Sequence, residues 1–488
     1  MANPNMPNEL LIDVGLTETR IAVVEDGRVV GIDIDRRRQK SLIGSIWLGR
    51  VTRIMAGMQA AFVDIGLDRA GFLAARDARV LGPAGREAPA MAQLVHEGQA
   101  VLVQVAKDAH GDKGVRLTAD ISLPGRNLVY APLGSGVFVS RRIEDGAERA
   151  RLAEALANLD GAPGGFILRT AAAGATADAI RAEAAELAKA WSALSDAAGK
   201  AKPPACLKLD LDPVERALRD HLTPAVERVR VNSAAGLARA RAYAENAMRD
   251  LAGRIELHRG PAPIFALYGI EDDLAQAAGR RVPLPSGGAI AIDATQALTA
   301  IDVDSGSFVA GRNIEDTALR TNLEAAAEIA RQLRLRGIGG IVVIDFIHLD
   351  EPAHREQLQE TLKSALARDR APIRVSNLSE FGLVELTRKR TGEPLLHLLT
   401  ESCGVCAGEG RAAAADAIAA EVVRRAQAEA ATAPGLPLTL VVAGDIAEAL
   451  ERDDCVAALA EATGVAVTLR RDAAYRRNQF DVVAGAPP

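Results

Sequence analysis

Two apolar runs that each end in an aspartate constrain this chain more than any other feature. The runs 298–302 (LTAID) and 341–345 (IVVID) have the pattern of buried strands. Between them, residues 314–336 carry leucine and alanine at helical spacing, and Gly337 is suited to end a helix. Because strands separated by a long helix form an α/β unit, we expect the stretch 281–401 to fold as an α/β domain.

The carboxylates that end these runs, Asp302 and Asp345, form the first candidate site. Ligands of open α/β sheets bind at the carboxyl ends of strands. Two carboxylates brought together there would need a cation or a proton between them. Hard oxygen ligands suit Mg²⁺ or Mn²⁺, which can orient water against a phosphodiester. Strand alternation puts Asp304 on the same face as Asp302. The alternative is that each aspartate caps a helix or forms a surface ion pair.

Composition is that of an ordinary globular protein. The 488 residues are 49% hydrophobic and 25% charged, and a chain of this length suggests about three domains. The formal net charge of −6 excludes a histone-like protein that binds nucleic acid by bulk charge, but it allows a local basic groove. The apolar runs are too short to span a bilayer, and the N-terminus lacks the pattern of a secretion signal. The chain contains only four cysteines, which favours the reducing cytoplasm over a disulfide framework.

The rest of the chain is expected to form several further regions. Short β-like runs fill residues 8–35, with a hairpin turn at Glu25–Gly27. An alanine-rich helix is predicted from 176 to 198, and residues 213–253 are helical by pattern. The tail, 412–488, has the pattern of a small separate αβ domain.

A β-rich stretch from 39 to 119 contains the second candidate site. Phe62 and Phe72 flank a turn that begins and ends with glycine, and cations lie around them. Aromatic side chains framed by cations on a small β-barrel are how oligonucleotide-binding folds stack bases. The alternative is that both phenylalanines are core residues. The surrounding cations are Arg50, Arg53, Lys107, Lys113 and Arg116.

Cys403 and Cys406 form a CxxC pair on a glycine-rich loop, which is the third candidate site. Two thiolates at this spacing supply half of a tetrahedral zinc site. Because Cys206 and Cys455 stand alone, the missing ligands would come from His397 or from a second copy of the chain. A redox CxxC and a pair of unliganded thiols are the alternatives.

Arg169 and Thr170 follow an apolar run, 166–168, and form the fourth candidate site. A guanidinium and a hydroxyl can bind a terminal phosphate through forked hydrogen bonds. The alternative is a solvated surface arginine, because the dipeptide alone carries little information.

Several long segments, taken together and in this order, resemble the ribonuclease E/G family. Three of them match its catalytic core, one matches its S1 domain, and one is a CxxCxG element. The resemblance is strong over residues 8–411 and weak in the tail. The core segments are 297–303 (ALTAIDV), 321–336 (TNLEAAAEIARQLRLR) and 339–346 (GGIVVIDF), and the others are 59–64 (QAAFVD), 284–288 (LPSGG) and 403–408 (CGVCAG).

The resemblance implies a multidomain α/β fold in which an S1 β-barrel of the OB type is inserted into an RNase H-like subdomain without catalysis of its own. The implied domains are an RNase H-like subdomain in two parts (1–38 and 213–280), an S1 RNA-binding domain (39–119), a 5′-phosphate sensor (120–212), a DNase I-like catalytic domain (281–401), a zinc link (402–411) and a small C-terminal domain (412–488).

The resemblance also implies the activity. Members are Mg²⁺-dependent endoribonucleases that cut single-stranded, A/U-rich RNA and leave 5′-monophosphate products. Because the long disordered scaffold of the larger members is missing here, we expect the short, G-type enzyme. Such an enzyme acts in ribosomal RNA 5′-end maturation and messenger decay in the cytoplasm. We therefore expect neither a membrane tether nor a degradosome scaffold.

Roles for individual residues come from the same resemblance. Asp302 and Asp345 would hold the catalytic Mg²⁺. Cys403 and Cys406 would share one structural Zn²⁺ with the same pair of a second chain in a homodimer, and pairing of dimers into a tetramer is left open. The RNA-binding residues would be Phe62, Phe72, Lys107 and Lys113. The pocket that senses a 5′ monophosphate would consist of Gly125, Val129, Arg141, Arg169 and Thr170.

Three positions depart from the family pattern. Asp304 stands where the family usually has asparagine, His348 where aspartate is common, and Glu380 where larger members carry arginine. These departures bear on cleavage rate, metal preference and grip on RNA. The competing hypothesis is an RNA-binding protein that acts in ribosome assembly without cleavage. The Asp302 and Asp345 pair separates the two hypotheses, because a pure binder has no need of it.

Overall fold

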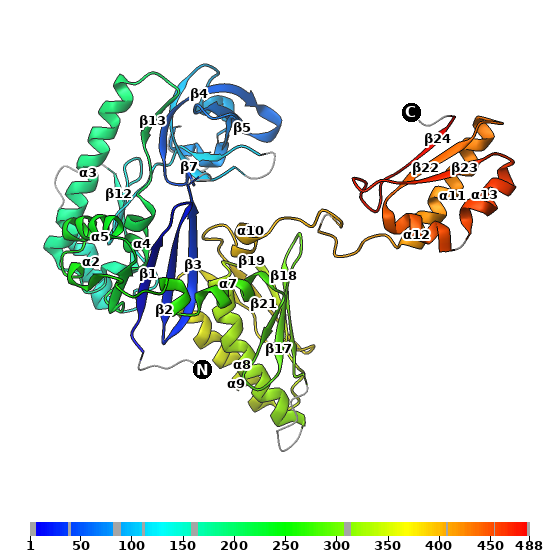
Figure 1. The fold of residues 1–488 in the computed structure, drawn as a ribbon. Coiled ribbons are helices and arrows are strands. Elements are labelled where there is room, and N and C mark those ends of the chain that lie inside the picture. Colours follow the sequence, from blue (N-terminus) through cyan, green and yellow to red (C-terminus); the bar gives the residue numbers. More distant parts are fainter. Residues whose placement is uncertain are drawn as a thin grey trace. The chain divides into compact units, whose positions relative to one another are not determined.

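The fold is known from a computed structural model, which describes residues 6–37, 41–81, 89–109, 113–157, 164–306, 314–406, 408–452 and 454–485. The chain divides into two compact units, Met1–Leu398 and Leu399–Pro488. Of the five sheets found in the described residues, four belong to the first unit and one to the second (Figure 1). In those same residues no helix combines the length and the apolar character that crossing a membrane requires.

The first sheet joins segments from two distant parts of the chain. Asp26 and Gly27 have φ of 53° and 74°, as a tight hairpin turn requires, so the predicted turn is confirmed. The expectation of helix throughout 213–253 is wrong, because Arg228–Val231 alternates with period two and pairs in parallel with β1. Two helices, α4 (Pro213–His221) and α5 (Ala234–Ala247), flank it. The strands, in spatial order, are β15 (Ile255–Leu257), β14 (Arg228–Val231), β1 (Glu9–Val14), β2 (Glu18–Glu25) and β3 (Arg28–Arg36).

The second sheet closes into a five-stranded barrel. Its first strand also pairs with its last, and apolar side chains such as Val63 and Leu73 fill the interior. β13 (Ala205–Lys208), which comes after the next domain in the sequence, adds to this sheet beside the first barrel strand. The barrel strands are β4 (Ile46–Met55), β5 (Ala60–Asp64), β6 (Gly71–Ala74), β8 (Arg116–Thr118) and β7 (Ala100–Lys107).

Within the described residues, the third sheet carries helices on one face only. Tyr130 and Phe166 stack at 4.9 Å between ring centroids and form part of the core beneath α2 (Gly146–Ala157) and α3 (Ala177–Lys200). The hydroxyl of Thr176 caps α3 by accepting a hydrogen bond from the Ala179 amide. The strands are β11 (Gly136–Val139), β12 (Gly165–Leu168), β10 (Leu128–Ala131) and β9 (Leu123–Pro124).

The fourth sheet contains the predicted α/β unit. Two of its strands, β18 and β19, are parallel, and the helices α8 (Ile314–Leu335) and α9 (Pro352–Ala367) cover one face. Gly337, with φ of 64°, ends α8 as predicted, and the Ile338 amide donates to the Leu333 carbonyl. The other face is open to solvent at Ala300, Asp302 and Asp345. The strands are β16 (Arg281–Pro283), β17 (Ala289–Ala294), β18 (Thr299–Asp304), β19 (Gly340–Asp345), β21 (Leu383–Arg388) and β20 (Ile373–Val375).

The second unit has its own core. The helix α11 (Ala415–Thr432) packs on a three-stranded sheet through buried residues such as Val422 and Leu440. The sheet contains β23 (Val467–Arg471), β22 (Leu438–Val442) and β24 (Phe480–Ala484), and α12 (Gly444–Arg452) and α13 (Cys455–Thr463) complete the unit.

Candidate functional site

Asp302 and Asp345 lie directly opposite each other on parallel, hydrogen-bonded strands. The register of β18 and β19 pairs the two residues, and neighbouring strands are about 4.8 Å apart. Ile301 and Ile344, the preceding residues, point into the core, so both carboxylates project from the open face. Asp304 is exposed on the same face of β18.

Neither carboxylate has a protein partner in the described part of the chain. Among the described residues, no hydrogen bond or ion pair reaches the side chain of Asp302 or Asp345, whereas the Asp304 carboxylate lies 3.5 Å from Arg281 and accepts from the Gly306 amide. The described residues contain no cluster of three or more His, Cys, Asp or Glu that could hold a metal. Two unneutralised carboxylates on an open face fit Mg²⁺, which proteins often bind through one or two carboxylates with water and substrate phosphate.

The loop that follows Asp345 is fixed by a buried asparagine that sequence reasoning did not single out. Asn322, fully buried in α8, donates to the Ile347 carbonyl at 2.7 Å and accepts from its amide at 3.0 Å. Glu315 accepts from the amides of Asp350 and Glu351, both at 3.2 Å. These contacts hold the loop that follows Asp345 at the end of β19. A polar residue within the apolar face of a predicted helix was the available signal for Asn322.

The two departures that follow β19 and precede β21 are both exposed. His348 lies 3.2 Å from Asp350, and both side chains are open to solvent. Glu380 is exposed in the turn before β21. In the same turn the Gly382 carbonyl accepts from the Phe346 amide, so Glu380 lies on the segment that contacts the residue after Asp345.

The barrel carries a cross-strand row of cations and aromatic rings. In register, Arg53 lies opposite Phe62, Phe62 opposite Phe72, Phe72 opposite Arg116, and Arg116 opposite Lys107. Such a row of aromatic faces framed by cations suits single-stranded nucleic acid.

The phenylalanines of this row lie outside the barrel core. Both are half-buried, their ring centroids are 6.1 Å apart with an edge-on geometry, and neither belongs to the buried core cluster. Arg116 is held by Asp77 at 2.7 Å. Lys107 and Lys113 are exposed, and neither has an ion pair within the described ranges.

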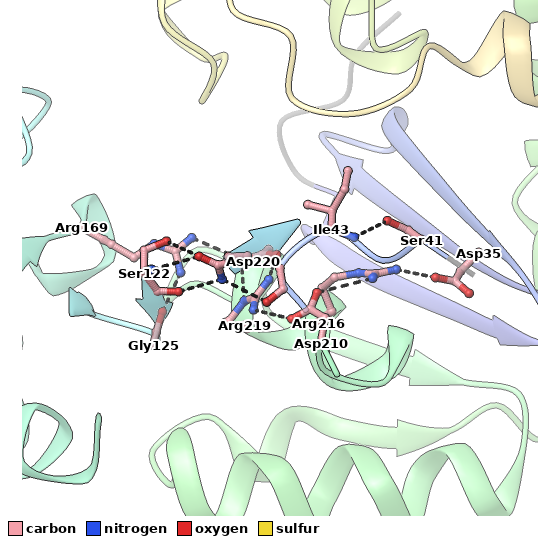
Figure 2. Close-up of polar contacts among 12 residues, drawn as sticks. Asp35, Ser41, Ile43, Ser122, Gly125, Arg169, Asp210, Arg216, Arg219 and Asp220 are labelled. Carbon is pink, nitrogen blue, oxygen red and sulfur yellow. Dashed lines mark hydrogen bonds and ion pairs between the residues drawn. The ribbon is translucent and has the colours of Figure 1, made fainter. Parts of the chain in front are cut away.

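Arg169 and Thr170 lie at the end of β12 and are anchored in different ways. The Arg169 guanidinium donates to the Gly125 carbonyl at 2.7 Å and lies 3.2 Å from Asp220 (Figure 2). Its side chain is 30% exposed, so it is not the freely solvated arginine of the alternative interpretation. The Thr170 hydroxyl lies 3.1 Å from that of Ser140 and is accessible.

Asp220 is a second residue that sequence reasoning missed. Arg219 donates to both of its carboxylate oxygens, at 3.0 and 2.8 Å. Burial alone would raise the pKa of Asp220, but the hydrogen bonds from Arg219 and the charge of Arg169 outweigh it and lower the pKa. Asp220 is therefore an ionised carboxylate that orients Arg169.

Glu183 lies beside Gly125, whose carbonyl accepts a hydrogen bond from Arg169. Its carboxylate accepts from the Asn127 amide at 3.0 Å and from the Asn127 side chain at 2.9 Å. Burial raises the pKa of Glu183. A Cβ on Gly125 would lie 2.1 Å from Glu183 Oε1, so a larger residue there would displace the Glu183 carboxylate. Val129 is half-buried on the outer face of β10, and Arg141 is exposed after β11.

Alternating charges extend from Arg169 across α4. Arg219 lies 3.4 Å from Asp210, Arg216 lies 3.6 Å from Asp210, and Arg216 also contacts Asp35 at 2.6 Å (Figure 2). A second connection reaches the fourth sheet. Arg370 donates to the Asp220 carbonyl, and Arg142 donates to the carbonyls of Asp369 and Ala371 at 2.9 and 3.0 Å.

The CxxC loop belongs to the second unit. Cys403 is exposed and Cys406 half-buried. Backbone amides of Cys406 and Val405 contact the Cys403 sulfur and lower its pKa, which favours the thiolate that binds metals. Cys206 lies on β13 of the first unit, and Cys455 begins α13 of the second.

The fold and these sites define a class of protein. A family model described as the ribonuclease E/G family matches residues 122–391, more than half of the chain. The chain therefore belongs to the ribonuclease E/G family, as the resemblance predicted, and it is an endoribonuclease.

Individual relatives place it more closely within the family. It is 38% identical to Ribonuclease G of Salmonella typhimurium (strain SL1344) over 488 residues, covering 98% of this chain and 100% of the relative. It is 38% identical to Ribonuclease G of Escherichia coli (strain K12) over 487 residues, with the same coverage. To Ribonuclease E of Escherichia coli (strain K12) it is 39% identical over 420 residues, which cover 85% of this chain but 40% of the relative.

Proposed function

We propose that this chain is a Mg²⁺-dependent endoribonuclease that cuts single-stranded, A/U-rich RNA and favours substrates with a 5′ monophosphate. The observation that carries the proposal is the pair Asp302 and Asp345. The two carboxylates are opposite in register on an open sheet face. Within the described ranges, neither has a counterion.

The proposed reaction is hydrolysis of one phosphodiester bond. Asp302 and Asp345 would hold the ion, which when bound supplies electrophilic stabilisation of the phosphate and activation of a water. The water oxygen bonds to phosphorus and the 3′ oxygen leaves with a proton. One product then ends in a 3′ hydroxyl and the other begins with a 5′ monophosphate. Asn322 would keep the end of β19 in place during this step.

The barrel row would bind the RNA strand. We propose that Phe62 and Phe72 stack bases, while Lys107 and Lys113 contact phosphates. Half-exposed rings outside the core support this role. Stacking on aromatic rings and contacts between phosphates and cations do not depend on base sequence. The A/U preference would therefore come from the ease with which A/U-rich RNA is single-stranded.

The region around Arg169 would recognise the 5′ monophosphate. Its guanidinium is oriented by Gly125 and Asp220, and the Thr170 hydroxyl is accessible beside it. We propose that Val129 and Arg141 complete the pocket. In the cell, this specificity would serve ribosomal RNA 5′-end maturation and messenger decay in the cytoplasm. The domain boundaries implied by the family resemblance are part of the same proposal.

One experiment tests the proposal. A single-stranded A/U-rich oligonucleotide is supplied with a 5′ monophosphate or a 5′ hydroxyl, each in Mg²⁺ and in EDTA. We expect cleavage only with Mg²⁺ and faster cleavage of the monophosphorylated RNA. Binding without cleavage in Mg²⁺ would instead support the non-cleaving RNA-binding protein. Equal rates on the two RNAs would overturn the 5′-monophosphate preference alone.

We also propose that Cys403 and Cys406 share one structural Zn²⁺ with the same pair of a second chain. Zinc in structural sites takes four ligands, and a two-fold axis repeats the available pair. We expect one Zn²⁺ per two chains by metal analysis, and Cys403→Ser should release zinc and shift sedimentation towards monomers. Cys206→Ser and Cys455→Ser are the matched controls. One Zn²⁺ per chain in a monomer would instead indicate that His397 completes the site.

A further inference from the structure

An apolar row crosses the outer face of the third sheet. In register, Phe138 on β11 lies opposite Ile167 on β12, Ile167 opposite Val129 on β10, and Val129 opposite Pro124 on β9. Phe138 is 62% exposed and Ile167 is 44% exposed. The row is therefore a continuous apolar surface and not a set of scattered side chains.

Strand alternation explains why this row faces outwards. Val137 and Val139, on either side of Phe138, pack against the core beneath α2 and α3. Phe166 and Leu168, on either side of Ile167, are buried in the same core. Since successive side chains point to opposite faces, the side chains of Phe138 and Ile167 must lie on the face opposite α2 and α3. Packing of the sheet against α2 and α3 therefore does not explain a phenylalanine at position 138.

The row ends beside the polar groups of the proposed 5′-phosphate pocket. Arg169 follows Ile167 by two residues with an extended backbone, at φ of −77° and ψ of 165°, so it continues the same face about 6.6 Å further along the strand. Ser140 follows Phe138 by two residues, and its hydroxyl contacts that of Thr170. An apolar platform and a phosphate-binding edge therefore adjoin on one face.

We propose that Phe138, with Ile167 and Val129, is the platform on which the 5′-terminal nucleobase of the RNA stacks. This inference rests on the proposed function of Arg169 and Thr170 and adds a contact to the base. Exposed aromatic rings on a sheet face are a recurrent means of stacking unpaired bases. A cationic, hydroxyl-bearing edge matches a nucleotide, which joins an apolar ring to a phosphate, better than it matches an apolar protein surface.

The test removes the base and the ring separately. Binding is measured in EDTA, so that cleavage does not enter, with one 5′-monophosphorylated RNA that begins with adenosine and one whose first nucleotide is abasic. We expect the wild-type protein to bind the abasic RNA about tenfold more weakly, within the range of one base–aromatic stack. Phe138→Ala should lose the same factor on the adenosine RNA and nothing on the abasic RNA. Phe138→Leu should fall between the two.

Leu133→Ala is the matched control, because Leu133 is 47% exposed in the turn before β11 and outside the row. It should bind both RNAs as the wild type does. Equal affinity of the wild type for the two RNAs would overturn the platform, as would equal losses on both RNAs in Phe138→Ala. A change in sedimentation of Phe138→Ala without a base effect would also overturn it and assign the row to a protein contact. Cleavage in Mg²⁺ and the 5′-hydroxyl comparison, run on the same preparation, report separately whether the proposed function holds.

Discussion

The first unit contains two groups of aspartates with opposite electrostatic surroundings. Asp302 and Asp345 lie opposite each other, and neither carboxylate forms an ion pair within the described ranges. Asp220 and Asp210, in contrast, each contact at least two arginines. Two like charges side by side destabilise the folded state, whereas paired charges hold elements together. The unpaired group therefore supports the proposed cation site, and the paired group supports the proposed role of Asp220 in orienting Arg169.

The largest expected effect is in the unpaired group. Asp302→Asn and Asp345→Asn should each reduce single-turnover cleavage roughly a hundredfold or more, because a metal ligand charge is lost. RNA binding in EDTA should be retained, and the melting temperature should not fall, since no protein contact is broken and one of two like charges is removed. Asp304→Asn is the matched control on the same face and should remain active. Near wild-type cleavage in Asp302→Asn or Asp345→Asn would break the comparison.

The paired group predicts a change in selectivity. Arg169→Ala should lower the preference for 5′-monophosphorylated over 5′-hydroxyl RNA by about tenfold to a hundredfold, the worth of a charged hydrogen bond. Asp220→Asn should lower it less, because Arg169 keeps the Gly125 contact. Ratios of kcat/KM on the two RNAs measure this. Arg181→Ala, a surface arginine paired with Asp178, should leave the ratio unchanged, and equal losses on both RNAs would indicate a structural Arg169.

The barrel row repeats the contrast between paired and unpaired charges. Lys107→Ala should weaken RNA binding and reduce the slope of log K against log salt concentration by about one. The melting temperature should not change. Arg116→Ala should mainly lower the melting temperature, because Asp77 loses its ion pair at 2.7 Å and keeps only the longer contact to Arg76, at 3.8 Å. Phe62→Ala should weaken binding by about 1–3 kcal/mol if the ring stacks on a base. Binding and melting measured on one preparation separate these outcomes, and a stability loss alone in Phe62→Ala would make that ring core packing.

The smallest effect concerns pH. The pKa of Asp220 is lowered in the folded state, so its contribution to stability is present above its ordinary pKa of about 3.9 and is lost as the pH falls through the folded-state value. Asp220→Asn should therefore be less stable than the wild type at pH 7, and the difference should shrink in acid. Melting temperatures from pH 7 to pH 3 test this. A difference that does not change with pH would mean that the charge of Asp220 contributes nothing.

Local patterns predicted the parts of the molecule that depend on local physics. The helix α8, its end at Gly337 and the strands β18 and β19 follow from periodicity and from a glycine stop. The carboxyl ends of the two strands then bring Asp302 and Asp345 together without further information. The register that makes them direct neighbours required the structure, because an apolar run does not state which residues lie opposite.

Residues that act through distant partners escaped the sequence analysis. Asp220 contacts Arg169 across 51 positions of sequence. Glu183, on an alanine-rich helix, accepts a hydrogen bond from the Asn127 amide. Neither has a local signal that separates it from a solvated acid. Phe138 escaped for a similar reason, since only the register of β11 against β12 shows that it extends an exposed row. The strand β14 was missed because its four residues lie between two helices.

The first two sheets pair strands from distant parts of the sequence, and this affects how the chain folds during synthesis. Arg228 on β14 lies opposite Glu9 on β1, and β13 joins the barrel only after the third sheet. During synthesis the N-terminal strands therefore wait, with one edge of β1 unpaired, until the barrel and the third sheet have left the ribosome. An unpaired edge is a template for aggregation, and late long-range pairing slows folding. A ribosome that stalls before β14 would release a nascent chain that chaperones must protect, whatever the stability of the finished enzyme.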